Sequence, residues 1–173
     1  MLARLLAAST AFFVAAPAAI APRSWLDGPV SNWNQPRMAI PRAPKPEQEA
    51  AGTRPPVTAE ERALEHLGWH PMGPAIHHGR LALVRASVEG GDLHFMQHYN
   101  WFAFSDGRFI GTLAPGPMTS STDGAIGEPY EVTNTGFKAA YARYTPTDPF
   151  CCPSRVSELS FQVKGGPAHS VGS

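Results

Sequence analysis

The stretch that decides the fold of this chain is Tyr99-Asn100-Trp101-Phe102-Ala103-Phe104-Ser105-Asp106-Gly107-Arg108-Phe109-Ile110-Gly111-Thr112-Leu113. Aromatic and β-branched residues flank an Asp-Gly pair, and such side chains suit a pleated, half-buried surface. Asp106 and Gly107 tolerate the positive φ angles that a type I′ turn requires. The stretch therefore predicts an antiparallel hairpin with strands over residues 92–104 and 108–113.

The hairpin is one part of a longer run of predicted strands. A β-rich apolar run at residues 81–88 ends at a second turn, Gly90-Gly91, and residues 115–129 have the composition of an exposed loop. Further strands are expected at residues 130–133, 137–144 and 155–164. Consecutive strands with short connections predict an α+β fold: a mostly antiparallel sheet of about six strands with one N-terminal helix on one face.

The helix is predicted by its ends and by its apolar face. Thr58 and Glu61 match a capping box, in which each side chain accepts a hydrogen bond from the other residue's backbone N–H. Ala63, Leu64 and Leu67 then fall on one face, and Gly68 ends the helix.

The N-terminus follows the pattern of a secretory signal peptide over residues 1–21. Arg4 precedes an apolar run at residues 5–16, and small residues suited to signal peptidase follow at 16–18, with an alternative at 19–21. A buried or membrane-spanning helix is the alternative, but the run is shorter than the roughly 20 residues of a bilayer span. We therefore expect an extracytoplasmic protein, periplasmic or secreted.

The rest of the chain divides into three predicted parts. Residues 22–57 are rich in proline and are expected to be an extended spacer, although Trp25, Trp33, Met38 and Ile40 favour packing against the body. Residues 58–165 form the α+β domain, and residues 166–173 form a flexible tail. Lys and Arg number 14, as do Asp and Glu, and this balance argues against a nucleic-acid partner.

Cys151 and Cys152 are the only cysteines and are adjacent in sequence. A bond between them would close a small, strained and relatively reducible ring. One interpretation is a redox or metal-sensing element. The favoured one is a loop stiffened between prolines, because no C-x-x-C motif and no neighbouring Lys or His lowers the thiol pKa.

The sequence provides no catalytic, cofactor or metal motif. His66 and His70, and His94 and His98, are four residues apart, but Gly68 interrupts the first pair and a strand spacing of about 13 Å separates the second. Nucleophile-elbow, phosphate-loop and dinucleotide patterns are absent. Four aromatic residues are candidates for a binding face, with a place in the core as the favoured alternative: Trp101, Phe109, Tyr141 and Tyr144.

The chain resembles the LppP/LprE lipoprotein family of bacteria. The matching pieces are Trp33-Asn34, Met38-Ala39-Ile40-Pro41, Gly68-Trp69, Asp106-Gly107-Arg108-Phe109-Ile110-Gly111-Thr112-Leu113 and Asp148-Pro149-Phe150-Cys151-Cys152-Pro153-Ser154. The resemblance implies an exported, envelope-associated protein of undefined activity and implies no catalytic residues. The lipid-accepting cysteine implied by the family name has no counterpart near the cleavage region, so we expect no stable membrane anchor after signal cleavage.

These observations together predict a non-catalytic protein with an envelope-associated or binding role and no cofactor. Its partner would be an unidentified envelope protein or a small ligand, contacted by a face of the sheet or by the loop at residues 115–129. The second hypothesis is a thiol-based redox or metal-handling protein that uses Cys151 and Cys152, and the third is an enzyme of unfamiliar type, which an apolar pocket with several converging polar groups would favour.

Overall fold

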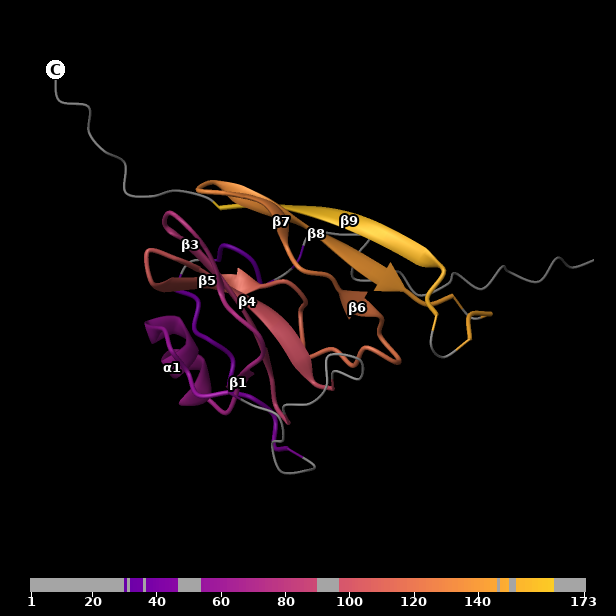
Figure 1. Ribbon diagram of the computed structural model, residues 1–173, viewed down its shortest axis with the longest axis horizontal. Coiled ribbons are helices and arrows are strands. Elements are labelled where there is room, and N and C mark those ends of the chain that lie inside the picture. Colours follow the sequence, from indigo (N-terminus) through magenta and orange to yellow (C-terminus); the bar gives the residue numbers. More distant parts are fainter. Residues whose placement is uncertain are drawn as a thin grey trace, which may run out of the picture.

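The computed structural model describes residues 30, 32–35, 37–46, 54–89, 97–145, 147–149 and 152–163. These residues contain one helix, α1 (Ala59–Glu65), and two antiparallel sheets (Figure 1). The first sheet holds β1 (His70–Pro71), β2 (Ile76–His78), β3 (Leu81–Ser87), β4 (Tyr99–Ser105) and β5 (Arg108–Thr112). The second holds β6 (Ala125–Ile126), β7 (Tyr130–Thr133), β8 (Gly136–Arg143) and β9 (Arg155–Gln162).

The predicted hairpin forms the centre of the first sheet. β3 and β4 pair along their whole length, and β5 lies on the other side of β4. Asp106 and Gly107 have φ angles of 50° and 71°, which confirms the Asp-Gly turn. β4 begins at Tyr99, later than expected, because His98 has a φ of 43° and interrupts the extended backbone. The short strands β1 and β2 share the outer edge of β3.

β8 is the central strand of the second sheet. β9 pairs with all of β8, while β6 and β7 pair with different parts of its other edge. The strands predicted at residues 130–133, 137–144 and 155–164 are thus present, whereas β1, β2 and β6 were not predicted. Each of these unpredicted strands has only two or three residues, too few to show an alternating pattern.

The two sheets pack face to face, and this corrects the expectation of a single sheet. β4 is buried along its whole length, so both of its faces need a cover. Tyr99, Trp101 and Ala103 join the core between the two sheets, whereas Phe102 and Phe104 join a second core beneath α1. Figure 1 shows the resulting three layers, with α1 and the second sheet on opposite sides of β4.

The helix begins as its sequence predicts. The Thr58 side chain accepts from the Glu61 backbone N–H, and the Glu61 side chain accepts from the Thr58 N–H, which confirms the capping box. Leu64 is fully buried in the second core, and the turn after His66 reaches Gly68. The helix is therefore short, and its stability depends on packing against the first sheet.

Part of the proline-rich segment packs on the body. The backbone N–H of Asn34 donates to the Ile110 carbonyl, and the Ala43 N–H donates to the Leu67 carbonyl, both at 2.8 Å. Trp33 and Ile40 are partly buried against the two cores. Gly111 permits this approach, since a Cβ atom there would lie 2.6 Å from the Asn32 carbonyl oxygen.

Several sequence predictions lie outside the described residues. These are the signal peptide at residues 1–21, the Gly90-Gly91 turn, His94, Cys151 and the tail at residues 166–173. Among the helices of the described part, none has the length and apolar character required to cross a bilayer.

Candidate functional site

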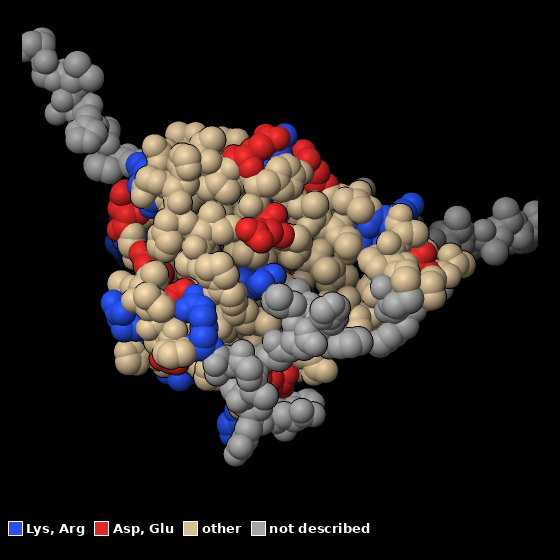
Figure 2. Space-filling view, in the orientation of Figure 1, with Lys and Arg blue, Asp and Glu red and all other residues tan. Residues whose placement is uncertain are grey.

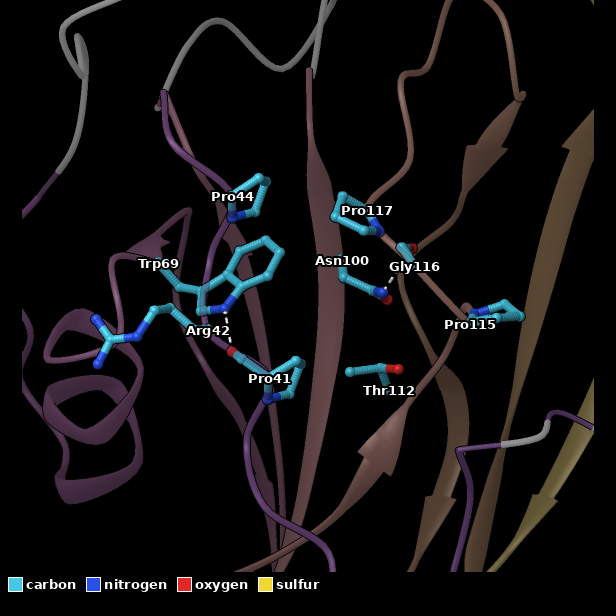
Figure 3. A pocket seen from close by; sticks show the side chains of 9 residues that line it. All are labelled: Pro41, Arg42, Pro44, Trp69, Asn100, Thr112, Pro115, Gly116 and Pro117. Carbon is cyan, nitrogen blue, oxygen red and sulfur yellow. Dashed lines mark hydrogen bonds between the residues drawn. The ribbon is translucent and has the colours of Figure 1, made fainter. Parts of the chain in front are cut away.

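A groove lies on the helix side of the first sheet, between the segment at residues 41–44 and the start of the loop at residues 115–129. Its volume is about 300 Å³, at the lower end of the range for small-molecule sites. Figure 3 shows its nine lining residues: Pro41, Arg42, Pro44, Trp69, Asn100, Thr112, Pro115, Gly116 and Pro117.

Trp69 forms part of one wall of the groove and is anchored from two directions. Its backbone N–H donates to the Leu64 carbonyl at 3.1 Å, so the end of α1 sets its position. Its indole Nε1–H donates to the Pro41 carbonyl at 2.7 Å. The ring packs edge-on against Phe102, with the centroids 4.8 Å apart. Trp69 is only 1% exposed, so it supports the segment at residues 41–44 and offers a ligand little of its surface.

Asn100 fixes the opposite wall. Its side-chain NH₂ group donates to the carbonyls of Ala114 and Gly116, at 3.0 and 2.9 Å. Its side-chain oxygen accepts from the backbone N–H groups of Trp101 and Ala114. The amide therefore has no hydrogen-bonding capacity left, and its role is to hold the Pro115–Pro117 turn in place.

A second polar contact closes the floor of the groove. The Thr112 hydroxyl donates to the Ala114 carbonyl at 2.6 Å and accepts from the Asn32 side chain. The described lining residues include no carboxylate, histidine or cysteine, and Arg42 extends away from the other lining side chains (Figure 3). The groove is thus suited to holding an apolar group and lacks an acid, a base or a nucleophile.

A second cleft, of about 450 Å³, lies beside α1 and contains Glu61 and His77. Glu61 is 1% exposed. It accepts hydrogen bonds from Arg54 and from the backbone N–H groups of Val57 and Thr58. Burial alone would raise the Glu61 pKa, but the hydrogen bonds from Arg54 and the backbone lower it to about 2. A carboxylate held in this way is a weak base, so Glu61 is not suited to act as a general base in this cleft.

Residues 80–166 match the family model of the LppP/LprE lipoprotein family. This chain belongs to the LppP/LprE lipoprotein family. The match confirms the resemblance and indicates an exported, envelope-associated protein. No curated protein and no solved structure matches the chain.

The region matched to the LppP/LprE family supplies only one side of the groove. Asn100, Thr112 and the Pro115–Pro117 turn lie inside residues 80–166, whereas Trp69 and the segment at residues 41–44 precede them. The loop at residues 115–129, predicted as a contact loop, does reach the groove. The wall formed by Trp69 and residues 41–44 was not predicted, and neither was the role of Asn100, although a polar residue inside an apolar run is a visible signal.

The four aromatic candidates do not share one face in this LppP/LprE member. Trp101 and Tyr141 are buried between the two sheets, and the Tyr141 hydroxyl donates to the Leu113 carbonyl at 2.6 Å. Burial raises the Tyr141 pKa. Phe109 packs against the core on the helix side, and Tyr144 lies just beyond the end of β8. A role for these residues in ligand contact stays a prediction.

The loop before β9 contains the described cysteine. Cys152 is disulfide-bonded and exposed, and its backbone N–H donates to the Pro149 carbonyl at 2.9 Å. Asp148 accepts from the backbone N–H groups of Thr145 and Ser154, at 2.7 and 2.9 Å, and these bonds lower the Asp148 pKa. The Asp148 carboxylate therefore links Thr145, before the cysteine, to Ser154, after it.

The histidines show no metal arrangement in the described part of the chain. Groups of three or more His, Cys, Asp or Glu side chains able to hold a metal ion are absent there. His98 lies 3.2 Å from the Glu89 carboxylate, while His66, His77 and His78 are exposed.

Proposed function

We propose that this LppP/LprE protein is a non-catalytic, envelope-associated binding module whose ligand inserts an apolar group into the groove between the two proline segments. The observation that carries the proposal is the lining: proline rings provide most of its apolar surface, Arg42 extends away from it, and the side chains of Asn100 and Thr112 are hydrogen-bonded to the protein. Apolar pockets of this kind gain affinity by excluding water from the ligand.

The ligand is a small molecule with an apolar body. The groove volume of about 300 Å³ accommodates one or two ring-sized groups and is too small for a folded partner. The family supports an extracytoplasmic place of action. Recovery of the unprocessed chain in the cytosol of its native cells would contradict this part of the proposal.

Gly116 offers a direct test of the groove. A Cβ atom at Gly116 would meet no atom within 4 Å, so a larger side chain is accommodated there without displacing the loop. Gly116→Phe should fill the groove and reduce the binding of a neutral apolar dye, N-phenyl-1-naphthylamine, by at least tenfold. Thr122→Leu, an exposed position in the same loop, is the matched control and should leave dye binding unchanged. Equal binding by the wild type and Gly116→Phe would overturn the proposal.

A second candidate function is thiol–disulfide chemistry at Cys152. The observation that favours it is that Cys152 is exposed and disulfide-bonded, as accessible redox-active disulfides are. Alkylation followed by mass spectrometry, before and after mild reductant, would identify the bonded partner and the ease of reduction. If the disulfide resists reductant under native conditions and Cys152→Ser leaves the stability unchanged, the loop has no redox function and this second candidate is wrong.

A further inference from the structure

Three buried polar atoms on β3 and β4 have no hydrogen-bond partner. They are Nε of Arg85, Oγ of Ser87 and Nε1 of Trp101. Ser87 is 0% exposed and Trp101 is 2% exposed. Buried polar groups in folded proteins almost always have a hydrogen-bond partner, so three neighbouring polar atoms without one require an explanation.

The strand register brings these residues together. Arg85 lies directly opposite Trp101, and Ser87 lies opposite Tyr99. Alternation along each strand places all four side chains on the face that meets the second sheet. Directly opposite and diagonal neighbours on one face are within side-chain reach. The Arg85 guanidinium carbon lies 5.3 Å from the centroid of the Trp101 ring.

The Arg85 charge is not neutralised by the described residues. The ion pairs formed in the described part of the chain do not include Arg85. Burial lowers the Arg85 pKa, and the electrostatic effects of Glu128 and Tyr99 act in the opposite direction. Glu128 is itself exposed. A half-buried guanidinium without a close carboxylate is costly unless an anion accompanies it.

Donor groups dominate this cluster. An arginine Nε–H and an indole N–H can only donate, and a serine hydroxyl donates as readily as it accepts. Such a set would repel a metal ion and would satisfy the oxygens of an anion. We propose that Arg85, Ser87 and Trp101 form a binding site for an oxyanion, the carboxylate or phosphate group of a small ligand.

Access to the site is provided at the sheet edge. A Cβ atom at Gly73 would lie 3.3 Å from Nη2 of Arg85, so the guanidinium reaches the break between β1 and β2. Arg85 is partly exposed there. Successive side chains of a strand point to opposite faces of the sheet. Asn100 lines the groove of the proposed function, so that groove lies on the face opposite to Trp101. The anion site is therefore independent of that proposal.

Thermal unfolding tests the site with two probes, inorganic phosphate and benzoate, at ionic strength held constant with sodium chloride. At least one probe should raise the unfolding temperature in a saturable way, since a ligand that binds only the folded state stabilises it. Saturation by phosphate alone or by benzoate alone identifies the ligand group. Failure of both probes would overturn the proposal.

Variants separate the site from a general charge effect. Arg85→Gln should weaken probe binding at least tenfold, and Ser87→Ala should weaken it about threefold. Arg108→Gln removes the same charge from an exposed position on β5 and should bind the probe as the wild type does. In chloride buffer Arg85→Gln should unfold at the same temperature as the wild type or higher, because it removes an unpaired charge. Unchanged probe affinity in Arg85→Gln would overturn the proposal.

The Trp101 indole provides a readout that needs no Arg85 variant. Its Nε1–H resonance, assigned by its loss in Trp101→Phe, should shift downfield in a nitrogen–proton correlation spectrum as the probe saturates. The other indole signals should move less. A Trp101 signal that stays fixed at saturation would exclude this residue from the site and overturn the assignment.

Discussion

The two sheets use the same antiparallel pairing but differ in how many of their faces are covered. β4 in the first sheet is buried at every position, between α1 on one side and the second sheet on the other. β9 in the second sheet is exposed at five of its eight positions. The first sheet therefore carries most of the core, whereas the outer face of β9 is exposed to solvent.

The outer face of the second sheet carries a charged network instead of a core. Lys138 pairs with Glu131 at 3.0 Å and with Glu158 at 3.6 Å, and the Tyr130 hydroxyl donates to Glu158. Exposed pairs of this kind contribute little to stability. Figure 2 shows that basic and acidic side chains are interspersed on the face in view, in agreement with the balanced charge.

The largest effect is expected for a truncation in the covered sheet. Phe102 is fully buried and contacts Trp69 and Phe109. Phe102→Ala should lower the free energy of unfolding by about 3 to 5 kcal/mol, because it removes apolar contacts and leaves a cavity. Urea denaturation measures this change. A loss below about 1 kcal/mol would show that the helix-side layer is not a packed core.

The buried carboxylate of Glu61, in the first turn of α1, should give the next largest effect. The Glu61 pKa falls from 4.5 to about 2, so the folded state favours the ionised form, by roughly 3 kcal/mol at neutral pH. This contribution is complete above pH 4.5 and is lost as the pH falls towards 2.

Urea titrations at several pH values would measure that loss, with Glu61→Gln as the comparison. The variant should be less stable at pH 7 and should show a flatter pH dependence between 4.5 and 2. Glu65 is exposed on the same helix, and Glu65→Gln should retain the wild-type profile. An identical slope for Glu61→Gln would contradict the role assigned to this carboxylate.

A smaller effect is expected where the N-terminal segment meets the first sheet. Gly111 has a φ of 151°, and a Cβ atom there would lie 2.7 Å from Cε3 of Trp33. Gly111→Ala should destabilise the protein by about 1 to 3 kcal/mol and should expose Trp33, because the segment is pushed off β5. A red shift in tryptophan emission would report this displacement. Gly116→Ala, in open space, is the matched control.

The smallest effect is expected on the open sheet. Val156 is 73% exposed, so Val156→Ala should change the free energy of unfolding by less than about 0.5 kcal/mol. The same urea measurement applies. A loss similar to that of Phe102→Ala would mean that the outer face of β9 is covered in solution, and the contrast between the two sheets would not hold.

Short sequence motifs were sufficient to predict the start of the helix and the turn of the hairpin. The capping box of Thr58 and Glu61 and the Asp106-Gly107 turn involve near neighbours, and both were predicted correctly. The strands β8 and β9 were also predicted, from their alternating patterns, although eleven residues connect them.

The second sheet and the groove depend on contacts between distant residues. Asn32 and Thr112 are 80 positions apart, and Trp69 reaches the Pro41 carbonyl across 28. The hydrophobic periodicity of a sequence does not predict contacts between residues so far apart. The two-sided burial of β4 was readable in its apolar composition, but the sequence did not show that a second sheet would cover one of its faces.

The carbonyl of Gln162, at the end of β9, accepts from both the Trp33 indole at 3.0 Å and the Asn34 side chain at 2.5 Å. Trp33 and Gln162 are 129 positions apart in sequence but are joined by a hydrogen bond. The two ends of the folded body therefore lie next to each other. A short linker from the end of β9 to the segment that begins before Trp33 would join these two ends. With new termini at the Asp106-Gly107 turn, the resulting circular permutant should retain every strand pairing.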